Sequence, residues 1–376
     1  MDINFSSAPI PRIIFGTGQI YSLPAIVAAY GSRVLLLLGS ASFQKTPQWV
    51  KLQQLLAEGG NVVWVEHIHK EPTPECVDEI SGRYRNEKLH VVVAIGGGST
   101  LDGGKAVAAM LACSGGVTQY LEGVGHISPT GTKLPFIAVP TTSGTGSEVT
   151  CNAVISRIGS NGFKKSLRHQ NYTPDVAVLD PALTSTCPQE ITVNCAMDAF
   201  SQLVESYLSS KASPLTDDLA LGAIKRIRTS LAALCRGDGD IGDRSKMMYA
   251  ACISGITLTN AGLGIVHGFA SAIGGLFPIP HGLVCGTLMA AANEVTLCRL
   301  REEAESGRAA LKKYVQLGRL FSSREKAGDT YYQDSFIAML HQLTSAAKLA
   351  VLGKYGVRED DLDTIIQQSD CKNNPV

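Results

Sequence analysis

The sequence predicts an α/β fold, in which an N-terminal doubly wound parallel-sheet domain is followed by an all-helical C-terminal domain. In the first half of the chain, short apolar runs alternate with helical patterns, as in parallel sheets buried on both faces. Long amphipathic patterns dominate after about residue 181. The chain has 376 residues, more than the roughly 250–300 at which a single core stops growing. We therefore expect two domains, residues 1–183 and 184–376.

The predicted strands of the first domain are short apolar segments. They span residues 34–38, 61–65, 91–95, 136–139 and 176–179. A helix is expected from Pro47, with proline in its first turn and two glycines after its end, and another over 74–85. In a sheet of this kind, ligands bind beyond the carboxyl ends of the strands.

The predicted helices of the second domain are marked by long patterns with few prolines or glycines. These patterns cover residues 194–208, 215–235 and 245–259, and apolar helical segments follow around His267 and after His281. Such repeats of 3.6-residue period predict helices packed through one apolar face.

The composition narrows the class of protein. Hydrophobic residues make up 45% and charged residues 18% of the chain, and the formal net charge is zero. This charge balance argues against nucleic-acid partners and against electrostatic docking on a membrane. We find no apolar run approaching the ~20 residues that span a bilayer, and no signal peptide. The ten cysteines form no CxxC pair, which is typical of reduced thiols and predicts a cytoplasmic protein.

A glycine-rich turn follows the third predicted strand. The segment Val91–Lys105 reads VVVAIGGGSTLDGGK, so a buried strand ends in three glycines and a serine before a helix begins. Glycines let a backbone approach a phosphate, and the free N–H groups of a helix start attract anions. We therefore expect pyrophosphate binding at Gly97, Gly98 and Ser99, although this is not the usual GxGxxG pattern.

A second loop, rich in hydroxyl groups, follows the next strand. Residues 140–150 read PTTSGTGSEVT. Thr141, Thr142 and Ser147 offer hydroxyls for a ribose, a phosphate or the nicotinamide amide. A plain polar turn would also have this composition. Its place beside the glycine turn, at the same edge of the sheet, favours cofactor binding.

Four residues of the second domain form a candidate metal site. Asp198 and Gln202 are four apart on one predicted helix and therefore share a face. His267 lies in an apolar helix, and His281 lies near the start of the next one. A carboxylate, an amide oxygen and two imidazoles suit Fe, Zn, Mn or Ni. The alternative is a pair of hydrogen-bonded core histidines.

Taken together, these motifs resemble the iron-containing (group III) alcohol dehydrogenases. The resemblance rests on GGGSTLDGGK, PTTSGTGSEVT, the Asp198 helix and the two histidines fourteen residues apart, and FGTG at 15–18 and VLDP at 178–181 also fit. It implies the fold shared with dehydroquinate synthase, hydride transfer between NAD(P) and a small aldehyde or primary alcohol, and a homo-oligomer, commonly a dimer. By resemblance, Asp102 approaches the cofactor and Lys165 reaches its ribose.

Two departures from the family pattern concern the metal and the proton. Family members usually carry Asp-x-x-x-His on the metal helix, and here Gln202 replaces that histidine. We expect weaker metal binding, or a harder ion, because an amide oxygen is a weaker ligand than imidazole. Ser271 stands where many members have a further histidine, so a proton relay through that position is not expected.

The residues after the first predicted strand bear on the choice between NADP and NAD. NAD-selective folds place an acid on the adenosine ribose, where it repels a 2′-phosphate. Here the segment contains Gly39, Ser40 and Ser42, with Lys45 nearby, and no acid occurs between Asp2 and Glu58. We therefore predict NADP(H) over NAD(H).

The expected mechanism is metal-assisted hydride transfer, with Asp198, His267 and His281 as the catalytic metal ligands and Gln202 as a fourth ligand or a supporting residue. Three alternatives remain open at this point. They are a metal-free reductase of the maleylacetate reductase type, a dehydroquinate synthase-like lyase, and a non-catalytic nucleotide-binding protein.

Overall fold

The computed structural model describes residues 3–39, 42–159, 162–302 and 307–376. Within this part, the chain divides into two compact units. One is the α/β unit, Ala8–Pro188, and the other is the helical unit, which combines Gln189–Val376 with the described residues up to Ser7. The division therefore falls five residues after the one drawn from the sequence.

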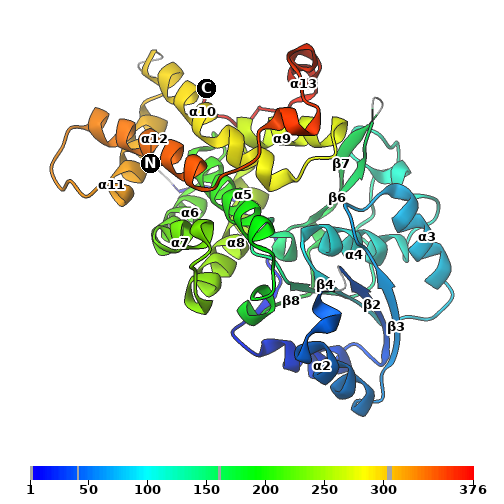
Figure 1. The fold of residues 1–376 in the computed structure, drawn as a ribbon. Coiled ribbons are helices and arrows are strands. Elements are labelled where there is room, and N and C mark those ends of the chain that lie inside the picture. Colours follow the sequence, from blue (N-terminus) through cyan, green and yellow to red (C-terminus); the bar gives the residue numbers. More distant parts are fainter. Residues whose placement is uncertain (1–2, 40–41, 160–161, 303–306) are drawn as a thin grey trace. The chain divides into compact units, whose positions relative to one another are not determined.

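The α/β unit contains a parallel sheet of six strands in the order β1-β8-β5-β4-β2-β3 (Figure 1). Its strands are β1 Arg12–Phe15, β2 Arg33–Leu38, β3 Val62–His67, β4 Val91–Gly96, β5 Phe136–Pro140 and β8 Val176–Leu179. The five apolar runs of the sequence form five of these strands. The edge strand β1 was not anticipated, because a four-residue strand that is mostly exposed carries no buried run.

Helices cover both faces of this sheet, which confirms the doubly wound architecture. They are α1 Leu23–Ala28, α2 Pro47–Glu58, α3 Pro74–Tyr84 and α4 Gly98–Met110. Strand β2 shows the arrangement best: Leu35 and Leu37 pack into the core beneath α3 and α4, while Val34, Leu36 and Leu38 pack into the core beneath α1 and α2. A strand buried on both faces has to be apolar throughout.

An antiparallel hairpin, β6 Asn152–Arg157 and β7 Phe163–Arg168, follows β5 and was not predicted. Buried polar contacts attach it to α4. The Asp102 carboxylate accepts a hydrogen bond from the Val154 amide at 3.1 Å, and Lys105 Nζ donates to the Asn152 carbonyl at 2.6 Å. The hairpin therefore holds the start of α4 from outside the main sheet.

The helical unit is built around α5, Gln189–Leu208, which packs against α6, α8 and α10. The other helices are α6 Pro214–Ile227, α7 Ser230–Arg236, α8 Ile241–Ala261, α9 Ile265–Leu276, α10 His281–Glu302, α11 Arg308–Phe321, α12 Asp329–Ala346 and α13 Leu362–Gln368. The pattern at 215–235 forms two helices rather than one. At the break, the Ser230 hydroxyl donates to Asp243 of α8 at 2.6 Å.

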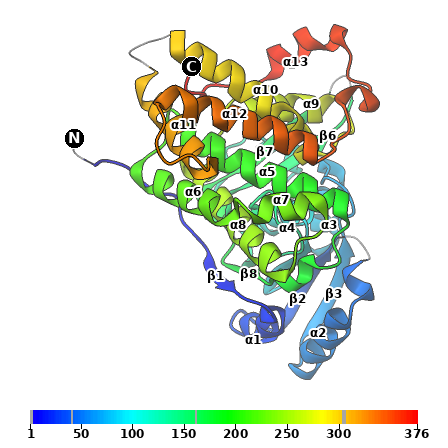
Figure 2. The same cartoon turned by 60° about the vertical axis from the view of Figure 1, so that its left-hand side comes forward.

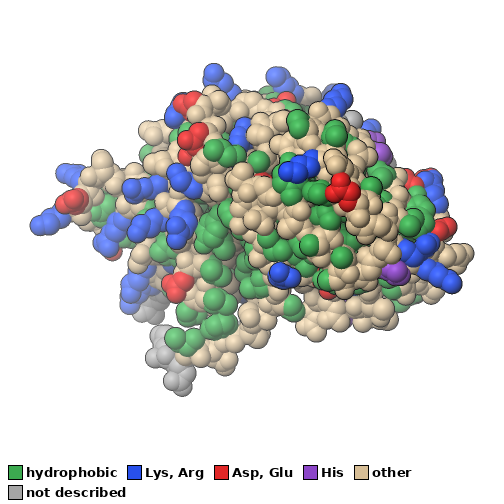
Figure 3. Space-filling view, turned by 90° about the horizontal axis from the view of Figure 1, so that it is seen from below, with side chains coloured by type: hydrophobic (Ala, Val, Ile, Leu, Met, Phe, Trp, Pro, Cys, Tyr) green, Lys and Arg blue, Asp and Glu red, His purple; other side chains and the backbone are tan. Residues whose placement is uncertain are grey.

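Helix α10 is long and apolar enough to cross a membrane by length and composition, which the sequence inspection did not anticipate. However, 56% of its most apolar stretch is buried inside the protein, where Leu283 and Val284 belong to a core shared with α9 and α13. Much of this helix therefore packs in the core of the helical unit. On the face shown in Figure 3, many Lys and Arg side chains gather on the left of the view, and apolar side chains are spread over its centre.

Candidate metal centre and cofactor loops

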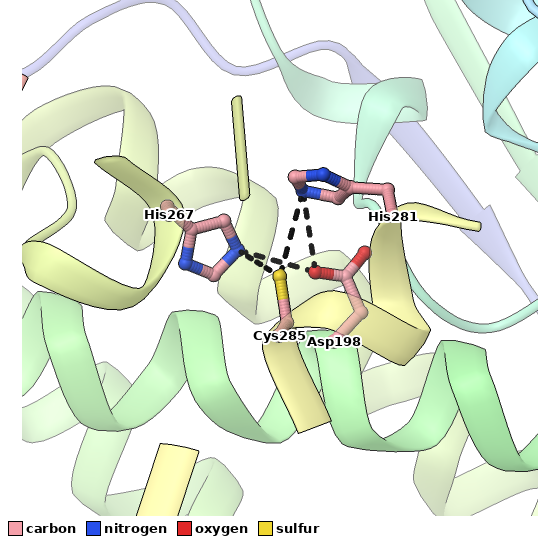
Figure 4. A group of neighbouring side chains, drawn as sticks. All are labelled: Asp198, His267, His281 and Cys285. Atoms are coloured by element: carbon pink, nitrogen blue, oxygen red, sulfur yellow. Dashed lines mark hydrogen bonds and ion pairs between the residues drawn. The ribbon is translucent and has the colours of Figure 1, made fainter. Parts of the chain in front are cut away.

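Four side chains converge inside the helical unit (Figure 4). Asp198 comes from the middle of α5, and His267 from the first turn of α9. His281 is the first residue of α10, and Cys285 follows one turn later on the same face. The chain turns sharply between α8 and α9, by 97°, and this turn brings the start of α9 to α5.

The distances within this cluster match those of a metal site. The Asp198 Oδ1 lies 3.2 Å from His267 Nε2 and 3.8 Å from His281 Nε2. The Cys285 sulfur lies 3.6 Å and 3.7 Å from the same two nitrogens. With bonds of about 2.0–2.3 Å, neighbouring donor atoms of a tetrahedral zinc site lie roughly 3.3–3.6 Å apart. The four side chains thus need little rearrangement to surround one cation.

Glu205 sets the orientation of His267. Its Oε2 lies 2.6 Å from His267 Nδ1, and its two oxygens also accept from the backbone amides of Val266 at 2.7 Å and His267 at 3.3 Å. A carboxylate at Nδ1 holds a proton there, so Nε2, which faces the cluster centre, is the nitrogen that gives up its proton when a cation binds. Supporting carboxylates of this kind are usual behind metal-binding histidines.

The charge of the cluster also calls for a cation. Asp198 is buried, which raises its pKa, but the hydrogen bond from His267 and the charge of His281 outweigh burial and lower it. Burial opposes protonation of His267, yet Cys285, Asp198 and Glu205 together raise its pKa well above the ordinary value. In the metal-free protein, a proton on His267 thus supplies positive charge beside Asp198. A divalent ion supplies the same charge, so the donors fit a metal.

Gln202 does not present its oxygen to this cluster. Its Oε1 accepts a hydrogen bond from the Ser254 hydroxyl of α8 at 2.6 Å, and its Nε2 donates to Asp198 Oδ1 at 3.3 Å. The amide group therefore supports the Asp198 carboxylate. The amide oxygen expected as the fourth ligand therefore points away from the cluster. The fourth donor atom within the cluster is the Cys285 sulfur.

Sequence reasoning found Asp198, His267 and His281 but missed Cys285 and Glu205. The signal for Cys285 was the four-residue spacing from His281, the same rule that had linked Asp198 to Gln202. Glu205 lies seven residues after Asp198, which also returns to the same helix face. A thiol in an apolar helix resembles a core residue, and this resemblance concealed it.

The glycine turn lies at the carboxyl end of β4, where the sequence placed it. Gly97 precedes α4, and the Thr141 amide donates to the Gly96 carbonyl at 2.9 Å, so the turn and the hydroxyl-rich loop after β5 lie side by side. A Cβ on Gly98 would lie 2.5 Å from Thr145 Oγ1. Only glycine fits this close approach, and Ser99 stands in the open first turn of α4.

Buried charges support the hydroxyl-rich loop. Lys105 is fully buried and its Nζ donates to the Ser147 carbonyl and to Thr150 Oγ1, both at 2.9 Å. The Ser147 hydroxyl donates to Asp102. Both Asp102 oxygens and the Ser147 hydroxyl are thus already bonded within the protein, whereas Thr141 and Thr142 are partly exposed.

The remaining predicted cofactor residues lie in two places. Gly39 directly follows β2, and its amide donates to the Ile95 carbonyl at 3.1 Å, next to the glycine turn. Ser42 and Lys45 follow and are exposed, whereas Ser40 lies outside the described residues. Lys165 is an exposed residue of β7 in the hairpin that is attached to α4.

The fold and the two sites point to one class of protein, the metal-dependent enzymes that use a nucleotide cofactor. The parallel sheet carries a glycine turn beside a polar loop, and the helical unit carries a cluster of carboxylate, imidazole and thiol donors. Comparison with known proteins gives the family. The family pattern described as "Iron-containing alcohol dehydrogenase" matches residues 10–181, and that described as "Fe-containing alcohol dehydrogenase family, C-terminal" matches residues 192–375.

Individual relatives agree. An NADPH-dependent butanol dehydrogenase from Clostridium saccharobutylicum is 30% identical over 357 residues, 94% of this chain and 87% of that protein. Alcohol dehydrogenase 4 of Saccharomyces cerevisiae strain YJM789 is 32% identical, over 85% of this chain and 80% of its own. A 1,3-propanediol oxidoreductase structure is 26% identical with a TM-score of 0.86, covering 99% of this chain and 96% of that one.

The chain therefore belongs to the iron-containing alcohol dehydrogenase family. It is an NAD(P)-dependent oxidoreductase that acts on small alcohols and aldehydes, and its helical unit contains a cluster of Asp and His donors that could hold a metal ion. The resemblance seen in the sequence is thereby confirmed. Within this fold, the alcohol dehydrogenase assignment replaces the lyase and non-catalytic alternatives.

Proposed function

We propose that the protein is an aldehyde reductase and alcohol dehydrogenase that prefers NADP(H) and depends on a divalent ion held by Asp198, His267 and His281. The observation that carries the proposal is the convergence of these three donors. Asp198 Oδ1 lies 3.2 Å from Nε2 of His267 and 3.8 Å from Nε2 of His281. A bound divalent ion supplies Lewis acidity, which stabilises the developing alkoxide by several kcal/mol.

The protein's own side chains prepare the site for this chemistry. Asp198 and the two imidazoles fix the position at which the substrate oxygen would be polarised, and Glu205 holds a proton on Nδ1 of His267 so that Nε2 can face the metal. His281 is the most exposed of the three, with 22% of its side chain accessible against 7% for His267 and 3% for Asp198. The substrate therefore approaches on the His281 side.

The cofactor is assigned to the loops of the α/β unit. Gly97, Gly98 and Ser99 would receive the pyrophosphate on free N–H groups at the start of α4, which is a natural anion site. Thr141 and Thr142 offer hydroxyls beside it. Asp102, Lys105 and Ser147 then have a supporting role, because their polar groups hold the loop and the hairpin.

The preference for NADP(H) rests on the segment after β2. Gly39, Ser42 and Lys45 offer hydrogen-bond donors and a positive charge, with no acid among them. On the neighbouring strand β3, Glu66 is engaged by Arg83 and by the Tyr84 hydroxyl. Relatives do not decide the point, since the NADPH-dependent butanol dehydrogenase and an NAD-dependent methanol dehydrogenase from Bacillus methanolicus are both 30% identical to the chain.

The cofactor proposal is tested by kcat/KM for NADPH and NADH with a short aliphatic aldehyde. We expect a higher value for NADPH, and Ser42→Asp should reduce this ratio because an exposed acid repels the 2′-phosphate. Gly39→Asp is a poorer probe, since a Cβ there would lie 2.8 Å from Thr100 Oγ1 and strain the turn. A strong preference for NADH in the unaltered protein would reject the proposal.

The metal proposal is tested by removing divalent ions with a chelator and assaying an aldehyde panel with NADPH. We expect consumption of NADPH to stop and to return when metal is added. Full activity of the metal-free protein would instead support a reductase of the maleylacetate reductase type.

We also propose that the chain forms a homodimer through β1. This strand is one edge of the sheet (Figure 2) and pairs only with β8 among the described strands. Its Ile13 and Phe15, and Ile10 just before it, are 38–50% exposed. An edge strand with exposed apolar side chains is a template for pairing with another chain. Ile13→Lys should convert the dimer to a monomer, as measured by sedimentation velocity. A monomer found for the unaltered protein would contradict the proposal.

We place the enzyme in the cytoplasm. None of the ten cysteines is paired in a disulfide in the structure, and five of them are only partly buried or exposed, where an oxidising compartment would act on them.

A further inference from the structure

The fourth donor position of the metal cluster departs from the family pattern in this chain. The position four residues after Asp198 carries Gln202, whose Oε1 accepts from Ser254 and whose Nε2 faces Asp198. An amide N–H₂ group cannot ligate a cation. Across the cluster, the Cys285 sulfur occupies a donor position within 4.8 Å of the three other donor atoms. The loss of an imidazole on α5 thus coincides with a thiol on α10.

We infer that Cys285 is the fourth protein ligand, so that the site is an Asp/His/His/Cys centre selective for Zn²⁺ over Fe²⁺. The inference rests on the proposed metal role of Asp198, His267 and His281. On binding, the thiol releases its proton to the solvent and a sulfur–metal bond forms.

The geometry of the sulfur supports a bond to the cation. Its distances of 3.6 Å to His267 Nε2 and 3.7 Å to His281 Nε2 agree with the roughly 3.6 Å between sulfur and nitrogen donors of a tetrahedral zinc site. Cys285 and His281 are one helical turn apart, so α10 presents both donors from one face (Figure 4). The sulfur is buried, and it points at the two imidazoles.

Metal selectivity follows from the chemistry of the donors. Thiolate is a soft ligand that favours Zn²⁺, whereas carboxylate and amide oxygens favour harder ions. Replacing an imidazole by an amide oxygen would weaken metal binding and shift the preference of the site toward harder ions. Replacing it by thiolate keeps four protein donors and shifts the preference toward zinc. A Zn²⁺ ion with these donors can still accept a substrate oxygen as a fifth ligand.

Cobalt substitution tests the sulfur bond without using activity. Co²⁺ added anaerobically to the metal-free protein should give visible d–d bands together with a near-ultraviolet thiolate-to-cobalt charge-transfer band. We expect Cys285→Ser to keep the visible bands and lose the near-ultraviolet band, while Cys252→Ser, at a buried cysteine of α8, keeps both.

Each contrary result is distinguishable. Visible bands without a charge-transfer band in the unaltered protein would overturn the Cys285 assignment while leaving the Asp/His/His site in place. Loss of cobalt binding in Gln202→Leu, with Cys285→Ser unaffected, would make the amide the fourth ligand and overturn it too. Absence of all cobalt bands, with His267→Ala behaving identically, would remove the metal site itself and with it the proposed function.

Selectivity is tested by competition. The metal-free protein is exposed to equal amounts of Zn²⁺ and Fe²⁺ without oxygen, and the bound metals are measured by elemental analysis. We expect a zinc-to-iron ratio that falls when Cys285→Ser is combined with Gln202→His, which returns the fourth donor to α5 as an imidazole. Zinc affinity in Cys285→Ser alone should fall by more than the about 10–100-fold lost when a supporting residue changes. An unchanged ratio would contradict zinc selectivity.

Discussion

Glu205→Gln changes the orientation of the metal-binding residue His267 while leaving that residue in place. Glu205 accepts hydrogen bonds from His267 Nδ1 at 2.6 Å and from the backbone amides of Val266 and His267. Glutamine has the same shape but only one acceptor oxygen. Its N–H₂ group must then face a donor, which is either the backbone amide or Nδ1 of His267. If it faces Nδ1, the proton of the neutral imidazole moves to Nε2 and blocks metal binding.

The magnitude follows from this contact. A hydrogen bond to a charged group contributes about 1.5–3 kcal/mol. Changes behind a ligating histidine cost about 10–100-fold in metal affinity, which corresponds to about 1.4–2.7 kcal/mol. The two estimates agree, so we expect zinc affinity in Glu205→Gln to fall by about 10–100-fold.

The assay is a competition titration against a chromophoric chelator, with thermal unfolding measured alongside. Glu190→Gln is the matched control, because Glu190 lies on the same helix α5 and is exposed. Zinc affinity of Glu205→Gln equal to that of the control would refute the orienting role. A large loss of folding stability with unchanged affinity would show that Glu205 serves only to cap α9.

Three further predictions concern the α/β unit. Burial raises the pKa of Glu148 to about 7, so the folded state binds its proton more tightly than the unfolded state. The stability that this proton provides is present below about pH 4.5. It is lost as the pH rises through 7, by up to about 3 kcal/mol. In urea unfolding, Glu148→Gln should lack this loss, and a pH profile of stability identical to that of the unaltered protein would contradict the prediction. Lys105→Met should lower the free energy of unfolding by about 3–5 kcal/mol, because buried partners lose their donor; a change below about 1 kcal/mol would contradict it. Gly98→Ala should raise KM for the cofactor without changing metal content, whereas Gly222→Ala, whose Cβ meets nothing within 4 Å, should change neither; an unaltered KM in Gly98→Ala would contradict the role of the turn.

The fold was largely predictable because burial on both faces imposes an unmistakable pattern. The buried positions of β2 must be apolar, and Val34–Leu38 are, so the place of this strand inside a parallel sheet could be inferred. Edge strand β1 and hairpin β6–β7 have polar or exposed positions in which no such pattern arises. Pairing with a distant strand decides their structure, and a local pattern does not report it.

The metal site was predictable in part. The four-residue spacing and the family resemblance identified Asp198, His267 and His281, but the direction of the Gln202 amide depends on Ser254, which is 52 residues away in the chain. The contribution of Cys285 depends on the angle between α9 and α10. Neither helix spacing nor composition contains that angle, so the ligand set needed the structure.

In the proposed mechanism, one divalent ion on Asp198, His267 and His281 supports hydride transfer. Elemental analysis and NADPH-dependent aldehyde reduction in the same preparations of the unaltered protein, His267→Ala and His281→Ala test it most directly. We predict about one divalent ion per chain in the unaltered protein, with metal and turnover lost together in both variants. Turnover that persists in a variant without metal would contradict the claim.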